Sequence, residues 1–198
     1  MNAKARGRVL VASNRGPVSF RLSDDGKLTS RRGGGGMVSG LSSVAGQAEV
    51  LWVCAALSDA DRTAARAAPD GYLDTPDASL DGAGSAVRML DIPAATFDRA
   101  YNVAFADALA AGAGPDGAAR RGGVRAMVQD YHLTLVPRML ADRRPDVAIG
   151  YFCHTPWAPP DYFAILPDDV GRHHGRLSAD HADRHAQARQ PHRQQRAP

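Results

Sequence analysis

The stretch that decides the fold is Val9-Leu10-Val11-Ala12-Ser13-Asn14-Arg15-Gly16-Pro17. Four apolar residues follow a basic leader and precede a polar turn, which predicts a short strand buried on both faces, the usual first strand of a parallel α/β sheet. Ligands of open α/β sheets bind beyond the carboxyl ends of the strands. Arg15 is placed at that end and carries a planar fork of donors that suits a phosphate or a carboxylate.

A glycine run, Gly33–Gly36, follows this strand and leads into Met37–Ala45, for which we expect a helix. Glycines let the backbone approach a ligand closely, and the first turn of a helix offers unpaired N–H groups to an anion. The glycine run and the start of the helix are therefore a candidate anion-binding site. The alternative is a plain flexible loop, since no Gly-Lys-Ser/Thr sequence ends the run and the glycines lie far from the strand.

The remaining apolar pattern predicts a single Rossmann-like α/β domain with a parallel sheet of about five strands and helices on both faces. Further strands are expected at Val50–Leu57, Val87–Leu90, Val124–Gln129 and Val147–Cys153. Helices are expected after the N-cap candidate Ser58, over the periodic stretch Phe97–Leu109, and at Tyr131–Arg144. Residues Phe20–Arg32 predict a hairpin or an exposed loop around Asp24-Asp25-Gly26.

Two more polar residues follow predicted strands. Asp130 comes directly after Val124–Gln129, where a carboxylate can accept hydrogen bonds from a ligand or cap the next helix, and both roles are compatible. His154 ends the fifth strand and is either a structural histidine or part of the same crevice. Arg15, Asp130 and His154 share one topological position, so we expect them at one edge of the sheet.

Composition limits the function classes. The chain has 198 residues and 44% hydrophobic content, enough for one domain core. Its net charge of +3 arises in residues 172–198, where six arginines against two aspartates give +4 and leave −1 for residues 1–171. A nearly neutral domain gives no support for nucleic-acid binding. We therefore predict a domain over residues 1–171 and a disordered Arg/His-rich tail over 172–198.

The cysteines and the leader indicate a compartment. Cys54 and Cys153 lie in apolar runs and are expected to be buried thiols of a reducing cytosol, while Trp52 is expected in the core. Met1–Arg8 lacks the apolar centre of a signal peptide, and no run is long enough to span a bilayer. We expect a cytoplasmic protein without membrane association.

Four motifs carry a resemblance to a known family. In order they are Ser13-Asn14-Arg15, the glycine loop into Met37-Val38-Ser39-Gly40-Leu41, Gln129-Asp130-Tyr131-His132-Leu133, and His154-Thr155-Pro156-Trp157. They resemble the successive motifs of trehalose-6-phosphate synthases, which are retaining GT-B glycosyltransferases. The resemblance covers about residues 8–170, the N-terminal, acceptor-side half of such an enzyme.

This resemblance implies transfer of glucose from a nucleotide-glucose donor to glucose 6-phosphate in trehalose biosynthesis. Arg15 would hold the acceptor phosphate, Asp130 would bind the acceptor sugar, and Asp130 and His154 would be the catalytic-site residues, with His154 beside the donor sugar. Gly35, Gly36 and Met37 would bind the nucleotide sugar. No metal and no cofactor is implied, and a homo-oligomer is compatible with the family.

The chain departs from the family pattern between Asn102 and Val103, where the resembled enzymes have a longer insertion with a Tyr and a Trp of the acceptor pocket. The family's donor-binding basic residues belong to a second domain that has no counterpart here. Two alternatives therefore stand beside the main hypothesis: a non-catalytic phosphosugar-binding module, and a pseudo-glycosyltransferase acting on cyclitol phosphates.

Overall fold

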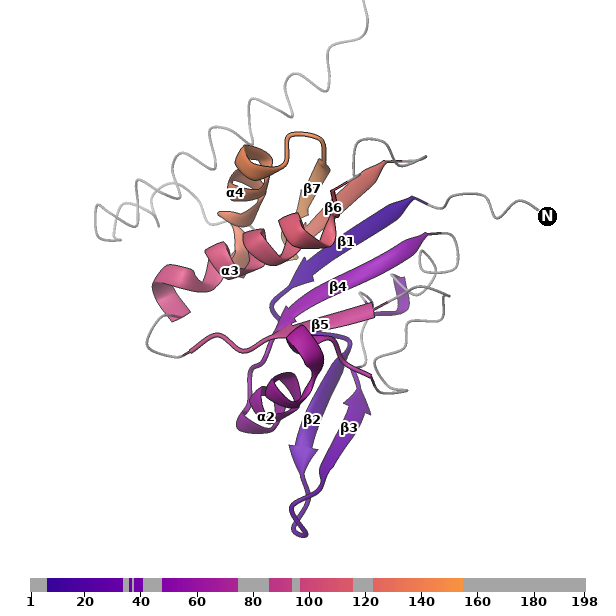
Figure 1. Ribbon diagram of the computed structural model, residues 1–198, viewed down its shortest axis with the longest axis vertical. Coiled ribbons are helices and arrows are strands. Elements are labelled where there is room, and N and C mark those ends of the chain that lie inside the picture. Colours follow the sequence, from indigo (N-terminus) through magenta and orange to yellow (C-terminus); the bar gives the residue numbers. More distant parts are fainter. Residues whose placement is uncertain are drawn as a thin grey trace, which may run out of the picture. The chain divides into compact units, whose positions relative to one another are not determined.

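The computed structural model describes residues 7–33, 36, 38–40, 48–74, 86–93, 97–115 and 123–154, and of residues 97–100 only the backbone. Its centre is a five-stranded parallel sheet in the order β5-β4-β1-β6-β7 (Figure 1). The strands are β1 (Arg8–Ser13), β4 (Glu49–Ala55), β5 (Ala86–Leu90), β6 (Val124–Gln129) and β7 (Ala148–Phe152). The predicted fold class and each predicted strand are confirmed.

Strand β1 takes the central position because its side chains are apolar on both faces. Leu10, Val11 and Ala12 are fully buried, and β1 pairs with β4 on one side and with β6 on the other. Successive side chains of a strand point to opposite faces, so a continuous apolar run requires cover on both. The order of the strands reverses at β1, which places the switch point of the sheet beside the end of this strand.

Two apolar clusters cover the two faces. Leu10, Val53 and Val128 belong to one cluster, which packs against helices α3 (Phe97–Gly112) and α4 (Val136–Arg143). Val11 and Trp52 belong to the other cluster, which includes Ala65 of helix α2 (Asp59–Ala67). The predicted placement of helices on both faces is confirmed, and so is the core position of Trp52, whose side chain is 0% exposed.

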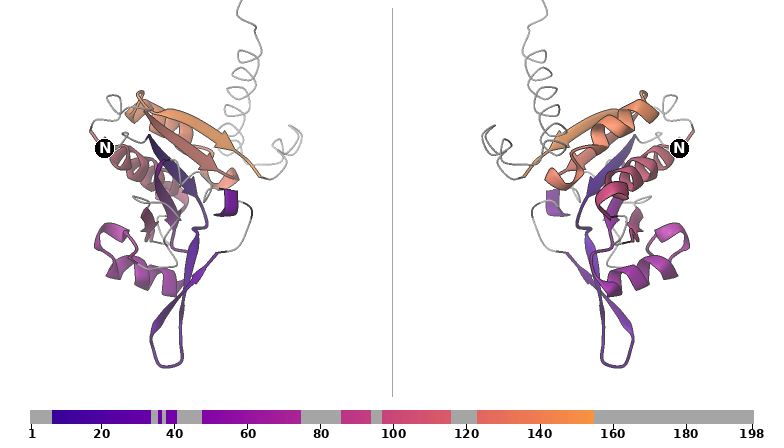
Figure 2. Two further views of the ribbon diagram at one scale, coloured as in Figure 1. Left: turned by 90° about the vertical axis from the view of Figure 1, so that its right-hand side faces the viewer. Right: turned by 90° about the vertical axis from the view of Figure 1, so that its left-hand side faces the viewer.

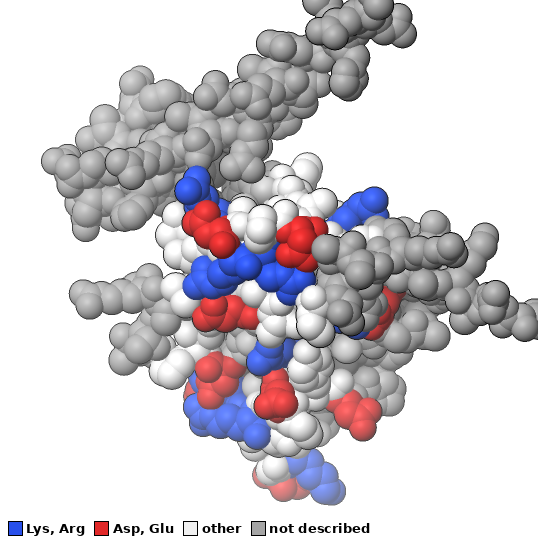
Figure 3. Space-filling model, turned by 45° about the horizontal axis from the view of Figure 1, so that its top comes forward, with Lys and Arg blue, Asp and Glu red and all other residues white. Residues whose placement is uncertain are grey.

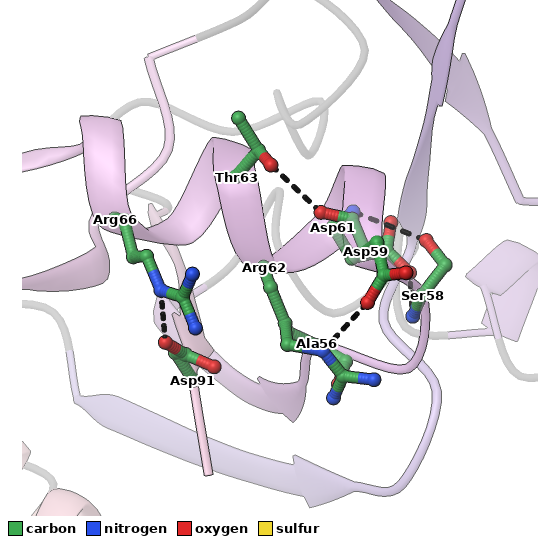
Figure 4. A network of polar contacts seen from close by, with 8 residues as sticks. All are labelled: Ala56, Ser58, Asp59, Asp61, Arg62, Thr63, Arg66 and Asp91. Carbon is green, nitrogen blue, oxygen red and sulfur yellow. Dashed lines mark hydrogen bonds and ion pairs between the residues drawn. The ribbon is translucent and has the colours of Figure 1, made fainter. Parts of the chain in front are cut away.

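Helix α2 begins as the sequence predicts, at the N-cap Ser58. The Ser58 hydroxyl accepts from the Asp61 backbone N–H at 3.1 Å, and the Asp61 carboxylate accepts from the Ser58 N–H at 3.0 Å (Figure 4). This reciprocal pair is a capping box, which satisfies two N–H groups that the first helical turn leaves unpaired. Near the other end of α2, Arg66 binds Asp91 at 2.6 Å and so joins the helix to the segment after β5.

Residues 18–32 form the predicted hairpin, with β2 (Val18–Leu22) antiparallel to β3 (Leu28–Arg32). The hairpin projects from the main sheet in Figure 2. The second oxygen of the Asp61 carboxylate accepts from the Phe20 backbone N–H at 2.8 Å, so the residue that closes the capping box also fixes the base of the hairpin. In Figure 1, α2 accordingly lies beside β2.

Of the two helices predicted after β5 and β6, one is confirmed and the other is divided. Helix α3 has the predicted buried face, with Tyr101, Phe105 and Leu109 in the core. The prediction of one helix over Tyr131–Arg144 is wrong, because the structure has a short 3-10 turn, η4 (Tyr131–Leu133), and then α4 starting at Val136. Pro137 has no N–H to continue a hydrogen-bond ladder from η4, and proline is tolerated in the first helical turn, so the α-helix starts afresh there.

Several predictions fall at or beyond the limits of the described residues. Gly36 and residues 38–40 are helical, as expected, whereas Gly35, Met37 and residues 41–45 lie outside the described residues. The predicted tail over 172–198 lies outside them as well. Cys54 is buried as predicted, but the prediction for Cys153 is wrong: it is only half-buried, because it comes after the last residue of β7, where cover from the sheet ends.

Candidate functional site

The carboxyl ends of three adjacent strands carry the three polar residues predicted from the sequence. Arg15 lies two residues past β1, Asp130 directly follows β6, and His154 lies two residues past β7. These strands are parallel neighbours in the order β1-β6-β7, so the three residues lie along one edge of the sheet. Among the described residues they make no hydrogen bond to one another. The backbone of Arg15 and the side chains of Asp130 and His154 each have their own partners.

The turn after β1 is fixed by a buried hydroxyl. The indole Nε1–H of Trp52 donates to the Ser13 Oγ at 2.7 Å, and the Ser13 hydroxyl donates to the Arg15 backbone carbonyl at 2.6 Å. Ser13 is 2% exposed and Trp52 is 0% exposed, so water does not compete for these bonds. The backbone of Arg15 is thereby tied to the core, while its guanidinium side chain is exposed to solvent.

Asn14 holds the same turn from the other face of the sheet. Its backbone carbonyl accepts from the Ala55 N–H at 3.2 Å, and its side-chain Oδ1 accepts from the Tyr101 hydroxyl of α3. Burial raises the pKa of Tyr101, with the nearby Cys54 as a smaller cause. The phenol therefore stays protonated and keeps its donor role at physiological pH.

Gly16 completes the turn by close packing. A methyl group built on Gly16 would overlap the Sγ of Cys54, which is buried in β4. Burial, with a smaller effect of the Asp61 charge, raises the pKa of the Cys54 thiol to about 12. The thiol is therefore neutral and acts as a packing group under the backbone that carries Arg15.

Asp130 has an unusual backbone conformation, with φ of 71° and ψ of 163°. This region is almost restricted to glycine, and other residues adopt it at a cost of about 1–3 kcal/mol when their surroundings impose it. Here the Asp130 N–H donates to the Phe152 carbonyl at 2.7 Å, and the Asp130 carbonyl accepts from the Tyr151 hydroxyl at 3.3 Å. Strand β7 thus holds both backbone polar groups of Asp130.

The Asp130 carboxylate caps the turn that follows it, with Oδ1 accepting from the Tyr131 N–H at 2.9 Å. The capping role predicted from the sequence is confirmed. Its Oδ2 lies 3.9 Å from His132 Nδ1, and the Cys153 Sγ lies 4.0 Å from Oδ1. An ionised carboxylate has about four lone-pair positions, so a half-buried Asp130 keeps acceptor capacity for a ligand hydroxyl.

His154 is exposed, and its ring is oriented by a partner that sequence reasoning missed. The Nε2 of His154 lies 3.0 Å from the Oε1 of Gln129, and the ring meets the edge of Phe152 with centroids 4.8 Å apart. Gln129 is the last residue of β6, pairs with Phe152, and is 5% exposed. A buried amide at the end of a parallel strand was the available signal, because such a group needs a nearby polar partner.

Of the candidate residues in the glycine loop, the structure describes Gly36. Gly36 is helical and exposed, and a methyl group built on it would meet no atom within 4 Å. Its backbone is therefore open to solvent on that side. Within the described ranges, no group of three or more His, Cys, Asp and Glu side chains is arranged to hold a metal ion, and no helix is long and apolar enough to cross a membrane.

A cavity of about 170 Å³ lies away from these residues, at the opposite edge of the sheet. Its lining includes Arg8, Glu49 and Ala86, the first residues of β1, β4 and β5. The Arg8 guanidinium pairs with Glu49 and donates to the Gly112 carbonyl at 2.8 Å, at the end of α3. These contacts join strands and a helix end, which is a structural role, so the cavity is not the candidate site.

Acidic and basic side chains alternate on the face that Figure 3 presents. Ion pairs of the described residues include Arg144 with Asp146 at 2.7 Å and Arg143 with Asp107 at 2.9 Å. This interleaving agrees with the nearly neutral charge predicted for residues 1–171.

Comparison with known protein families gives a match over part of the chain. Residues 95–179 match the model of glycosyltransferase family 20. Over 63 residues the chain is 49% identical to trehalose-6-phosphate synthases from Mycobacterium ulcerans and Mycobacterium marinum. That alignment covers 32% of this chain and 12% of each relative, so the aligned part is a small fraction of those enzymes.

Solved structures agree on the fold. The structure "Trehalose-6-phosphate from E. coli bound with UDP-2-fluoro glucose" superposes with a TM-score of 0.50 at 18% identity, covering 82% of this chain and 37% of that one. The N-terminal domain of Candida albicans trehalose-6-phosphate phosphatase gives a TM-score of 0.50 at 19% identity, covering 86% and 38%. The predicted family resemblance is confirmed, and the chain corresponds to little more than a third of those structures.

Proposed function

We propose that the chain supplies the acceptor-side half of a retaining glucosyltransferase. The proposal rests on its resemblance, over part of its length, to the trehalose-6-phosphate synthases and to glycosyltransferase family 20. Its substrates would be glucose 6-phosphate as acceptor and a nucleotide-glucose as donor. UDP-glucose is the first donor to test, since the similar E. coli structure was bound with UDP-2-fluoro glucose. The observation that carries the proposal is the alignment of Arg15, Asp130 and His154 along the ends of three adjacent strands.

The chemistry of these residues fits the two partners of the reaction. Transfer from a nucleotide sugar needs donors for phosphate groups and acceptors for sugar hydroxyls, arranged before charge develops. Arg15 would bind the acceptor phosphate through two parallel charge-assisted hydrogen bonds. Asp130 would accept hydrogen bonds from the acceptor sugar, and His154, oriented by Gln129, would face the donor sugar.

The glycine loop would complete the donor side. We propose that backbone N–H groups of Gly35, Gly36 and Met37 bind the nucleotide diphosphate, aided by the positive end of the helix that they enter. No step of this proposal requires a metal ion. In the resembled enzymes the basic residues that bind the donor belong to a second domain, which is why the proposal is limited to half of the active site.

Isothermal titration of the 198-residue chain with glucose 6-phosphate tests the acceptor site directly. Arg15→Ala should weaken binding by roughly tenfold to a hundredfold, because a charge-assisted contact contributes about 1.5–3 kcal/mol. The matched control is Arg138→Ala, which removes an exposed arginine of α4 that pairs with Asp142 and should bind like wild type. Equal affinity of wild type and Arg15→Ala would refute the assignment.

Turnover separates the functional alternatives. Release of nucleoside diphosphate from UDP-glucose in the presence of glucose 6-phosphate indicates the synthase reaction, whereas binding without release indicates a phosphosugar-binding module. Release with a cyclitol phosphate in place of glucose 6-phosphate would favour the pseudo-glycosyltransferase. We expect glucose 6-phosphate binding and little release, since the chain spans only 37% of the similar E. coli structure.

A further inference from the structure

Ser13 is the last residue of β1, and the proposed function assigns it no role. In the register of the sheet, Ser13 lies opposite Cys54 and Val11 lies opposite Trp52, so the side chains of Ser13 and Trp52 share one face. The Trp52 indole reaches Ser13 Oγ, and the Ser13 hydroxyl reaches the Arg15 carbonyl. Besides Trp52, the buried side chains of the cluster on this face, the one that includes Val11, are apolar apart from the thiol of Cys54.

The direction of both hydrogen bonds is forced by chemistry. An indole N–H can only donate and a backbone carbonyl can only accept, so the Ser13 hydroxyl must accept from Trp52 and donate to Arg15. A hydroxyl that accepts one bond is polarised as a donor for the next, which strengthens the pair in a buried environment. The bond from Ser13 Oγ to the carbonyl two residues ahead closes a small ring that restricts the backbone between Asn14 and Arg15.

We propose that Ser13 is a positioning residue that orients Arg15 for phosphate binding, an inference that rests on the proposed function of Arg15. The neighbouring residues are already fixed, since Asn14 bonds to Ala55 and Tyr101 and Gly16 packs on Cys54. The Ser13 hydroxyl holds the Arg15 carbonyl between these two anchors. Among the described residues the guanidinium itself has no hydrogen-bond or ion-pair partner, so its direction depends on its backbone.

Replacing Ser13 alone would mix two effects. Ser13→Ala removes the bond to Arg15, and it also leaves the buried Trp52 N–H without an acceptor, which destabilises the fold. Trp52→Phe removes that N–H while leaving the Ser13 hydroxyl free to donate to Arg15. The double variant Ser13→Ala/Trp52→Phe lacks the hydroxyl but has no orphaned donor, and it has the same side-chain volume at position 52 as the single Trp52→Phe variant.

The experiment therefore measures the effect of Ser13→Ala on glucose 6-phosphate affinity in two backgrounds, wild type and Trp52→Phe, by isothermal titration of the full chain. Positioning of Arg15 predicts the same loss in both, about threefold to tenfold, the range of one neutral hydrogen bond. The free energy of unfolding behaves differently: Ser13→Ala should lower it clearly in the wild-type background and much less in the Trp52→Phe background.

Two further variants make the readout specific. Ser58→Ala removes the N-cap of α2, lowers the free energy of unfolding, and should leave the affinity for glucose 6-phosphate unchanged. In an Arg15→Ala background, Ser13→Ala should cause no further loss of affinity, because the side chain that it orients is gone.

The possible outcomes are distinct. An equal loss in both backgrounds, absent without Arg15, supports the inference. A loss that follows stability, or an affinity that Ser13→Ala leaves unchanged, overturns the inference while the proposed acceptor site stands. Wild-type protein that does not bind glucose 6-phosphate overturns the proposed function, and the positioning role of Ser13 with it.

Discussion

Asp130 offers a quantitative test of the strain at the candidate site. Its φ of 71° and ψ of 163° are accessible to glycine but costly for any residue with a Cβ. Asp130→Ala and Asp130→Gly both lose the carboxylate that caps Tyr131, so that loss cancels when the two variants are compared. What remains is the relief of strain in the glycine variant, opposed by the greater flexibility of glycine in the unfolded chain.

The two terms set the size of the difference. Relief of strain is worth about 1–3 kcal/mol, and the entropy of glycine costs about 0.5–1 kcal/mol. Asp130→Gly should therefore be about 1 kcal/mol more stable than Asp130→Ala, which corresponds to roughly 2–4 °C in Tm for a domain of this size. At helical positions without such strain, the alanine variant is more stable than the glycine variant.

Urea denaturation of both variants measures this difference. A matched pair at Asp107, an exposed residue within α3, serves as the control, and there the alanine variant should be more stable by about 1 kcal/mol. If alanine is as stable as glycine at position 130, the backbone of Asp130 is not strained. Both Asp130 variants should also lose affinity for glucose 6-phosphate, since each lacks the acceptor oxygens.

Two predictions concern the packing beneath Arg15. Because burial raises the pKa of Cys54 from 9.0 to about 12, only the unfolded chain ionises this thiol between those values, and the free energy of unfolding should fall by about 1.4 kcal/mol per pH unit across that range. Urea denaturation at several pH values should show that the free energy of unfolding of Cys54→Ala lacks this fall. A slope against pH identical to that of the wild type would contradict the prediction. Gly16→Ala should lower the free energy of unfolding by about 1–3 kcal/mol, because the added methyl group overlaps Cys54 Sγ. Adding Cys54→Ala to that variant should restore most of the lost stability. A loss that persists in the double variant would show that the overlap with Cys54 is not its cause.

The sheet could be predicted from the sequence because its signals are local. Runs such as Val9–Ala12 are too apolar for an exposed position, and each is bounded by polar turn residues. The start of α2 was also readable, since Ser58 and Asp61 have the spacing of a capping box. These features depend on residues that are close in sequence.

The details of the site depend on contacts between distant segments. The partner of His154 is Gln129, and this pair exists only because β6 and β7 align Gln129 with Phe152. The conformation of Asp130 likewise depends on the Phe152 carbonyl and the Tyr151 hydroxyl. An aspartate gives no sequence signal for a positive φ of this kind, which a glycine would have given. Pro137 was a signal in the sequence for a new helix start. The short turn η4 that precedes it depends on the cap that Asp130 provides.

The two edges of the sheet differ in a way that bears on function. At the amino edge, Arg8 bonds to Glu49 and to the end of α3, so its charge is paired within the fold. At the carboxyl edge, Arg15 is exposed on an anchored backbone and Asp130 holds a costly conformation. A fold gains no stability from either feature, because a surface cation without a partner among the described residues contributes little and strain is unfavourable. Their presence at the edge where parallel sheets bind ligands fits the acceptor site that we propose, and the stability gain expected for Asp130→Gly over Asp130→Ala measures the cost of the strain at Asp130.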